Sequence, residues 1–173
     1  GWNITETNIQ QALQHVKKLT GLHGRWELLQ TNPTIIADVG HNADGIKQII
    51  QQLELTNHNH LHIVTGMVKD KDVDAALALM PKQATYYFTQ AHIPRAMDAI
   101  ELQKLAANHQ LIGNVFPDVN TAIEAAKNHV HKDDLILEIR TDSKTVSGIP
   151  VTAEDVEFSL KRLLVLSGNT HGN

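Results

Sequence analysis

Hydrophobic positions along the chain switch repeatedly between strand-like and helical spacing. Short apolar runs typical of buried strands occur at 25–30, 34–39, 61–67, 84–90 and 135–139. Apolar residues at helical spacing occur at 9–19, 43–53, 73–80, 95–109 and 121–130. Strands that alternate with helices predict βαβ units. We therefore expect an α/β fold with an open, mostly parallel sheet and helices on both of its faces.

The last part of the chain, 141–173, departs from this alternation and predicts one amphipathic helix. Thr152 is a candidate N-cap, and an apolar stripe follows it at Val156, Leu160, Leu163 and Leu164. A helix with such a stripe has to cover something, either an edge of the sheet or a second copy of the chain. We expect an atypical tail that could support self-association.

Composition excludes several classes of function. The chain has 173 residues, enough for one domain and a tail, and it contains no cysteine. That excludes disulfides, a catalytic thiolate and cysteine-bound zinc, and it favours a cytoplasmic location. A net charge of −4 does not predict the broad basic surface that binds nucleic acid. No apolar run approaches the ~20 residues that cross a bilayer, so we expect no membrane partner.

The turn between the strand at 34–39 and the helix at 43–53 carries the clearest candidate chemistry. It contains Asp38, His41 and Asn42, at a place where open α/β sheets bind ligands. Asp38 could accept a hydrogen bond from a ribose hydroxyl, and His41 could donate one to a phosphate or a carboxylate. Asn42 could cap the helix. The alternative is that both Asp38 and Asn42 serve only as caps and that His41 is a solvated turn residue.

Other basic residues are candidates for binding an anion. Arg25 lies at the start of the first strand, where a guanidinium either holds a phosphate or is a surface charge. Arg95 lies at the predicted start of a helix, where a surface position is the simpler interpretation. Lys69 or Lys71 could neutralise a ligand carboxylate, but the charged run at 66–72 is more typical of a solvated loop that ends in a helix cap.

Histidines at 58, 60 and 62 alternate, so an extended backbone would place them on one face. Such a row can bind a divalent metal where the rings converge. Residues 56–60 are typical of a polar loop, however, so only His62 is expected in the sheet. We therefore expect no metal site in this chain.

Four segments together resemble one enzyme family. They are GRWE at 24–27, DVGHN at 38–42, GMVKDKD at 66–72 and PRA at 94–96. In order and spacing they resemble the carboxyl-terminal domain of the folylpolyglutamate synthase/dihydrofolate synthase family, in the Mur ligase superfamily, over about residues 1–138. The resemblance implies a Rossmann-like domain at 21–140, preceded by a helical linker at 1–20 from an upstream ATPase domain.

The chain also departs from the family pattern. The family commonly has alanine where Gly40 stands and proline where Ala43 stands. After Leu137 it continues into a Gly-Ser turn and a further strand, whereas residues 138–145 here read EIRTDSKT. That difference removes the serine-bearing turn which in the family lies near the bound amino acid. Residues 148–164 instead resemble a segment of peptide-binding proteins that serve transporters.

The family resemblance implies part of an ATP-dependent ligase that joins glutamate to folate or dihydropteroate through an acyl phosphate. By that resemblance Arg25 would hold the ATP phosphates and stabilise charge during transfer, and His41 would act near the nucleotide or the glutamate. Asp38 would bind the ribose side of the nucleotide, and Asn42 would shape the turn.

The chain contains no P-loop of the form Gly-x-x-x-x-Gly-Lys-Ser/Thr. ATP would therefore be bound together with an upstream ATPase domain that supplies the P-loop and the Mg²⁺ ligands. We do not expect the chain alone to be active. The alternatives are another Mur-type amino-acid ligase, a stand-alone nucleotide- or anion-binding module, and an inactive chimeric chain.

Overall fold

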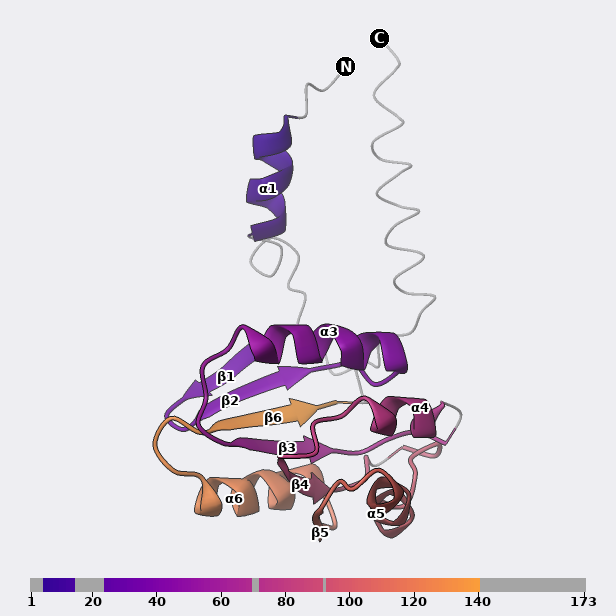
Figure 1. Ribbon diagram of the computed structural model, residues 1–173. Coiled ribbons are helices and arrows are strands. Elements are labelled where there is room, and N and C mark those ends of the chain that lie inside the picture. Colours follow the sequence, from indigo (N-terminus) through magenta and orange to yellow (C-terminus); the bar gives the residue numbers. More distant parts are fainter. Residues whose placement is uncertain (1–4, 15–23, 70–71, 92, 141–173) are drawn as a thin grey trace. The chain divides into compact units, whose positions relative to one another are not determined.

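A computed structural model describes residues 5–14, 24–69, 72–91 and 93–140 (Figure 1). The chain divides into two compact units, one of residues 24–142 and one of residues 1–23 with 143–173. In the latter unit the described element is helix α1 (Glu6–Gln14), which overlaps the helical segment predicted at 9–19. Thr5 Oγ1 accepts a hydrogen bond from the Asn8 N–H at 3.2 Å, and Asn8 Oδ1 accepts one from the Thr5 N–H at 3.0 Å. This reciprocal pair caps the start of α1.

The unit that begins at residue 24 is built on one six-stranded sheet in the order β1-β2-β6-β3-β4-β5. Its strands are β1 (Glu27–Thr31), β2 (Thr34–Asp38), β3 (Leu61–Thr65), β4 (Thr85–Phe88), β5 (Gly113–Val115) and β6 (Leu135–Ile139). β1 and β2 pair antiparallel, and the other neighbouring strands pair parallel. The prediction of an open, mostly parallel sheet is confirmed.

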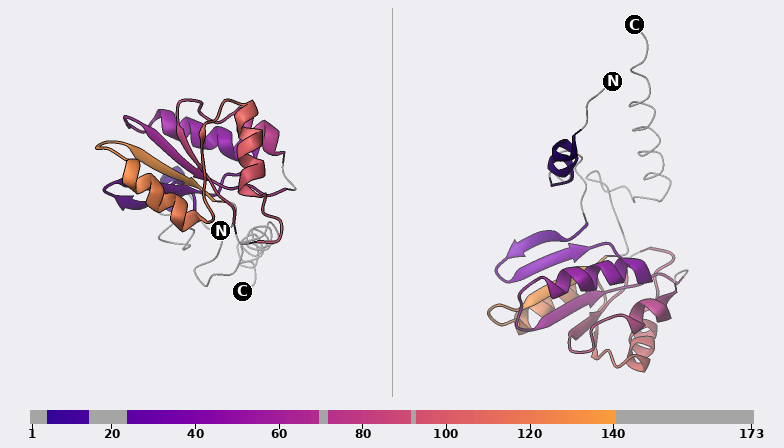
Figure 2. Two further views of the ribbon diagram at one scale, coloured as in Figure 1. Left: turned by 90° about the horizontal axis from the view of Figure 1, so that it is seen from below. Right: turned by 45° about the horizontal axis from the view of Figure 1, so that its top comes forward.

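Four helices cover the two faces of the sheet. They are α3 (Ala43–Glu54), α4 (Val73–Ala78), α5 (Ala99–Asn108) and α6 (Val119–His129). One face packs against α3, α4 and α5 through a core that includes Ile46, Leu77 and Leu102. The other face packs against α6 through Ala122 and Ala126 (Figures 1 and 2). Helices on both faces bury the central strands, which explains why β3 and β6 read as continuous apolar runs.

The last described strand lies in the middle of the sheet. β6 pairs with β2 on one side and with β3 on the other, so the chain returns through α6 from the far edge. The carboxyl ends of β2, β6, β3 and β4 therefore lie along one edge of the sheet. In open sheets this edge, where the order of the strands reverses, is where ligands bind.

One local expectation is wrong. The helix expected from residue 95 begins at Ala99, because Asp98 accepts hydrogen bonds from the Ile100 and Glu101 N–H groups and caps it. Arg95 therefore lies in a loop before the helix. In that loop the Met97 N–H donates to the Met67 carbonyl oxygen at 2.7 Å.

Strand β5 has no counterpart among the predicted elements. It is three residues long and begins at Gly113, where a Cβ atom would collide with the carbonyl oxygen of Tyr86. The helix expected within 148–164, and the residues that replace the family's Gly-Ser turn after Arg140, lie outside the described residues. No described helix combines the length and the apolar character needed to cross a bilayer.

Candidate functional site

The turn between β2 and α3 is held by hydrogen bonds within it. Asn42 is the N-cap of α3, and its Oδ1 accepts a hydrogen bond from the Gly45 N–H at 2.8 Å, as the sequence predicted. His41 Nδ1 lies 2.8 Å from the carbonyl oxygen of Val39. A carbonyl oxygen only accepts, so Nδ1 carries the proton. The neutral ring then offers Nε2 as an acceptor, and only the doubly protonated ring can donate to an anion from that atom.

Asp38, at the end of β2, uses its carboxylate to join the turn to β1. Its Oδ1 accepts a hydrogen bond from the Gly40 N–H at 2.7 Å, and its Oδ2 accepts one from the Trp26 N–H at 2.8 Å. The side chain is buried, with 6% of the residue's surface exposed. The structure thus gives Asp38 a positioning role in the protein itself, whether or not it also touches a ligand.

Arg25 lies beside Asp38 because β1 runs antiparallel to β2, which brings the start of β1 to the end of β2. An Arg25 Nη1 atom lies 3.7 Å from Asp38 Oδ1, while the Arg25 side chain is 60% exposed. The backbone before it is fixed by Gly24, which has φ +86° and whose carbonyl oxygen accepts the Val39 N–H at 2.8 Å. A Cβ at Gly24 would lie 2.7 Å from Val39 Cγ1, so the position requires glycine.

These residues surround an open pocket of about 300 Å³, at the lower end of the size range for small-molecule sites. Its lining includes Arg25, Gly40, His41, Asn42, Asp44, Gly45 and Gln48. Asp38 is not part of the lining and supports the pocket from behind. The structure therefore brings Arg25, His41 and Asn42 to one pocket, with Asp38 in contact with Arg25.

Sequence reasoning missed the part of the pocket that α3 provides. Asp44 and Gln48 are one helical turn apart and both line it. Gly45 allows the turn to lie close to the helix, because a Cβ there would lie 2.7 Å from Gly40 Cα. The sequence signal for this part of the pocket is the pair of polar residues, Asp44 and Gln48, that lie four positions apart just after Asn42.

The pocket has a defined charge pattern. Arg25 contributes a positive charge, and the amino terminus of α3 contributes N–H groups at the positive end of its dipole. Asp44 carries a negative charge that Lys47 partly balances, with Nζ 3.4 Å from Oδ1. The arrangement suits a ligand with an anionic group near Arg25 and hydrogen-bonding groups along α3.

The other basic candidates lie apart from this pocket. Lys69 Nζ lies 3.7 Å from Glu101 Oε2 on α5, and the Lys69 N–H donates to the Arg95 carbonyl oxygen at 2.9 Å. Asp72 caps α4, so the charged run at 66–72 ends in a helix cap, as predicted. Asp70 and Lys71 lie outside the described residues.

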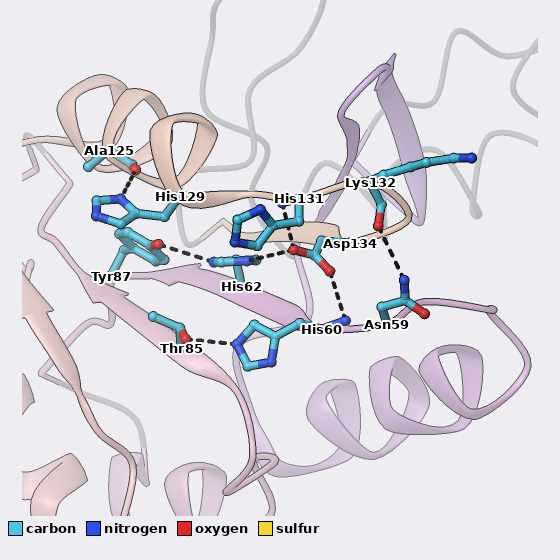
Figure 3. A network of polar contacts seen from close by, with 10 residues as sticks. All are labelled: Asn59, His60, His62, Thr85, Tyr87, Ala125, His129, His131, Lys132 and Asp134. Atoms are coloured by element: carbon cyan, nitrogen blue, oxygen red, sulfur yellow. Dashed lines mark hydrogen bonds and ion pairs between the residues drawn. The ribbon is translucent and has the colours of Figure 1, made fainter.

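Two of the alternating histidines, His60 and His62, lie at the amino end of β3 (Figure 3). His62 is in β3, as predicted, and is buried; its Nδ1 is 3.1 Å from the Tyr87 hydroxyl and its Nε2 is 3.6 Å from Asp134 Oδ2. Burial, with a smaller effect of His60, lowers the pKa of His62 despite the nearby Asp134 carboxylate. Among the described residues, no three side chains of the metal-binding types converge on a metal position.

Asp134 is the centre of this histidine network. Its oxygens accept hydrogen bonds from the His60 N–H at 3.1 Å and the His131 N–H at 2.7 Å. Burial opposes ionisation of Asp134, but the His131 N–H and the His62 ring outweigh it, so the pKa of Asp134 lies below its ordinary value. The network joins the amino ends of β3, β4 and β6 and has a structural role.

Comparison with known proteins gives a consistent result. Residues 24–138 match the Mur ligase family, glutamate ligase domain. The dihydrofolate synthase/folylpolyglutamate synthase of Buchnera aphidicola subsp. Schizaphis graminum is 27% identical over 135 residues, covering 76% of this chain and 31% of the relative. The enzyme of the same description from Mycobacterium tuberculosis is 29% identical over 146 residues, covering 82% of this chain and 30% of the relative. The chain thus spans about a third of the length of these relatives.

Solved structures agree with the sequence matches. The bifunctional folylpolyglutamate synthase/dihydrofolate synthase of Yersinia pestis, complexed with AMPPNP and Mn ion, superposes with a TM-score of 0.66 at 25% identity, covering 80% of this chain and 32% of that one. This enzyme and the two relatives above carry the same pair of synthase names. The resemblance of residues 148–164 to transporter-associated peptide-binding proteins is not confirmed.

Proposed function

Since this chain belongs to the Mur ligase family through its glutamate ligase domain, we propose that it is the carboxyl-terminal part of an ATP-dependent ligase. The reaction would add glutamate to folate or dihydropteroate, as the names of its relatives suggest. The family resemblance implies that the reaction passes through an acyl phosphate. An upstream ATPase domain, corresponding to the rest of those relatives, would carry the P-loop. The observation that carries the proposal is Arg25 beside the amino terminus of α3, at one pocket of suitable size.

Arg25 would bind the phosphates of ATP. Its guanidinium is more than half exposed, so it can reach a ligand, and the nearby Asp38 carboxylate limits the directions in which it points. A guanidinium can hold two phosphate oxygens at once. Negative charge builds up on phosphate oxygens during phosphoryl transfer, and a fixed cation at that position lowers the barrier.

The neighbouring residues would support this contact. Asn42 keeps the first turn of α3 in place, so that its N–H groups face the anion. His41 would act near the nucleotide or the glutamate through Nε2, because Nδ1 is occupied by the Val39 carbonyl oxygen. Asp38 would act mainly by orienting Arg25 and the turn, and its contact with a ribose stays a prediction.

ATP fits the donors of this pocket, whereas a metal does not. The pocket offers a guanidinium and a helix amino terminus to an anion, and the described residues contain no cluster of metal ligands. A structurally similar enzyme is complexed with AMPPNP and Mn ion. We therefore propose that this chain contributes to ATP binding and that the ligands for Mg²⁺ lie in the upstream domain.

The comparisons do not favour the other interpretations. A stand-alone binding module or a chimeric chain would give no reason for matches to one ligase group that continue over 76% and 82% of the chain. Another Mur-type ligase would share the domain, but the Buchnera and Mycobacterium relatives are named for folate substrates. A cytoplasmic location stays a prediction, as does self-association through the tail.

Titration of the 173-residue chain with ATP, followed by NMR, tests the nucleotide contact. We expect shifts at the amides of Gly40 and Gly45, and about tenfold weaker binding for Arg25→Ala, since loss of a charge-assisted hydrogen bond costs roughly 1.5 kcal/mol or more. Lys104→Ala, an exposed cation on α5, is the matched control and should bind ATP as the unaltered chain does. Equal affinity of the Arg25 variant and the unaltered chain would contradict the assignment.

The larger proposal has a separate test. The coding sequence directly upstream should specify a P-loop domain, and the joined protein should add radioactive glutamate to dihydropteroate or folate in the presence of ATP and Mg²⁺. An upstream sequence without a P-loop would overturn the ligase proposal. It would not bear on the ATP contact of Arg25, which the titration tests separately.

A further inference from the structure

A second, much smaller cavity lies at the carboxyl ends of β3, β4 and β6, where α6 begins. It has a volume of about 10 Å³, and its lining includes Gly66, Thr89, Val119, Glu138 and Arg140. In the sheet, Val64 of β3 lies beside Glu138 of β6 and Tyr87 of β4, on the face that α6 covers. Side chains two positions apart in a strand point to the same face. The positions two residues further along therefore lie on that face too; they are Gly66, Arg140 and Thr89. Because Gly66 has no side chain, it leaves space between Thr89 and Arg140.

Two polar atoms beside this cavity lack a hydrogen-bond partner among the residues that the structure describes. They are Oγ1 of Thr89, a residue only 1% exposed, and Nε of Arg140. Arg140 Nε lies 3.2 Å from Glu138 Oε1, close enough for an ion pair but without the direction of a hydrogen bond. Buried hydroxyl and N–H groups in native proteins almost always have partners, so two in one place indicate a bound group.

Size and charge define what that group is. The volume corresponds to roughly one water molecule, which needs about 10–15 Å³ by this measure. The positive charge of Arg140 and the amino terminus of α6 disfavour a cation, and the buried Glu138 carboxylate disfavours an anion. A neutral group that both donates and accepts hydrogen bonds fits this environment.

We propose that the cavity holds one ordered water molecule, which accepts a hydrogen bond from Arg140 Nε–H and bridges it to the Thr89 hydroxyl. The water fixes the guanidinium against β4. The backbone N–H of Arg140 donates to the Asp38 carbonyl oxygen at 2.7 Å, so the water also supports the strand end that carries the nucleotide pocket.

Thr89→Val tests the proposal by the direction of a stability change. Valine has the shape of threonine without its hydroxyl. If the water bridges Thr89 and Arg140, its hydrogen bonds are lost and the urea midpoint falls; if the cavity is dry, an unsatisfied hydroxyl is removed and the midpoint rises. Thr89→Ser keeps the hydroxyl and should retain the water, which separates hydrogen bonding from packing.

Thr65→Val is the matched control. The Thr65 hydroxyl is also buried without a hydrogen-bond partner among the described residues. Thr65 borders the same cavity, but its register with Phe88 and Ile139 places its side chain on the face toward α3, α4 and α5. Its removal should leave the midpoint unchanged or raise it. A fall equal to that of Thr89→Val would overturn the proposal.

A high-resolution crystal structure provides the direct measurement. We expect density for a water within hydrogen-bond distance of both Thr89 Oγ1 and Arg140 Nε, present in the Ser variant and absent from the Val variant. An empty cavity in the unaltered chain, or an anion in place of the water, would each overturn the assignment.

Discussion

The Asp38 carboxylate accepts a hydrogen bond from the Trp26 backbone N–H at 2.8 Å, although the two residues are 12 positions apart. The same carboxylate accepts the Gly40 N–H and lies beside Arg25. Trp26 has φ +43°, in the left-handed region that non-glycine residues seldom adopt, so the bond also holds an unfavourable backbone conformation. One buried acid thus fixes the start of β1, the end of β2 and the turn that follows.

Asp38→Asn should destabilise the chain. Asparagine keeps one acceptor oxygen but turns an NH₂ group toward one of the two backbone donors, so we expect a loss of about 1–3 kcal/mol in urea unfolding. ATP binding should weaken as well, since Arg25 loses its orienting charge. Asp44→Asn, an exposed carboxylate, should change stability by less than about 0.5 kcal/mol. Equal effects of the two variants would show that Asp38 has no positioning role.

Variants of Asn42 separate helix capping from anion binding. Asn42→Ala removes the cap of α3 and should cost about 1 kcal/mol of unfolding free energy. Asn42→Asp keeps a capping oxygen, so stability should be retained, but its added negative charge in the pocket should weaken ATP binding. Asp118→Ala, at the cap of α6, should lower stability without changing the affinity for ATP. Tighter ATP binding by Asn42→Asp would contradict an anion at this helix terminus.

Gly45→Ala should destabilise the chain even though alanine favours helices. In an unhindered helix interior the change stabilises by about 1 kcal/mol. Here the added Cβ would lie 2.7 Å from Gly40 Cα and 3.1 Å from the capping oxygen of Asn42, so the turn has to move. We expect a lower thermal midpoint and weaker ATP binding, whereas Gln51→Ala on the exposed side of α3 should change neither. A higher thermal midpoint for Gly45→Ala would show that the turn can move away from α3 without a loss of stability.

Stability should fall as the pH decreases below neutrality, because of His62. Burial lowers its pKa from 6.5 in the folded chain, so the unfolded chain binds more protons between that lowered pKa and 6.5. The free energy of unfolding therefore rises with pH through this window, by at most about 1.4 kcal/mol per pH unit for one proton. Asp134, whose pKa is also lowered, adds a further loss below 3.8.

Urea unfolding at a series of pH values measures this dependence. His62→Gln should reduce the slope in the pH window below 6.5, whatever its effect on stability at pH 8. An unaltered slope in His62→Gln would mean that His62 does not titrate differently in the two states.

The periodic elements of the fold could be predicted because strands that are buried on both faces of the sheet require apolar residues along their length. β3 and β6 are buried along their whole length and stand out as apolar runs. β5 is three residues long, begins with glycine and includes an exposed Asn114, so no local pattern marks it. The start of α5 was misplaced because the pairing of Met97 with Met67 is a long-range contact, and Asp98 is one of several possible caps.

The site was predictable to the extent that its residues lie next to one another in sequence. The DVGHN turn supplies His41 and Asn42, and capping by Asn42 follows from local rules. The approach of Arg25 depends on the antiparallel pairing of β1 with β2, which the spacing alone does not specify. The use of both Asp38 oxygens by backbone donors likewise depends on Trp26, a contact that is not local.

The position of β6 has a consequence for how the protein is made. Among the described strands a ribosome delivers residues 135–139 last, yet they separate β2 from β3 in the finished sheet. Before β6 is present, β2 and β3 each lack the strand that they pair with on that side. Pairing between strands that are far apart in sequence is slow, so we expect chaperones to bind the chain before β6 has paired.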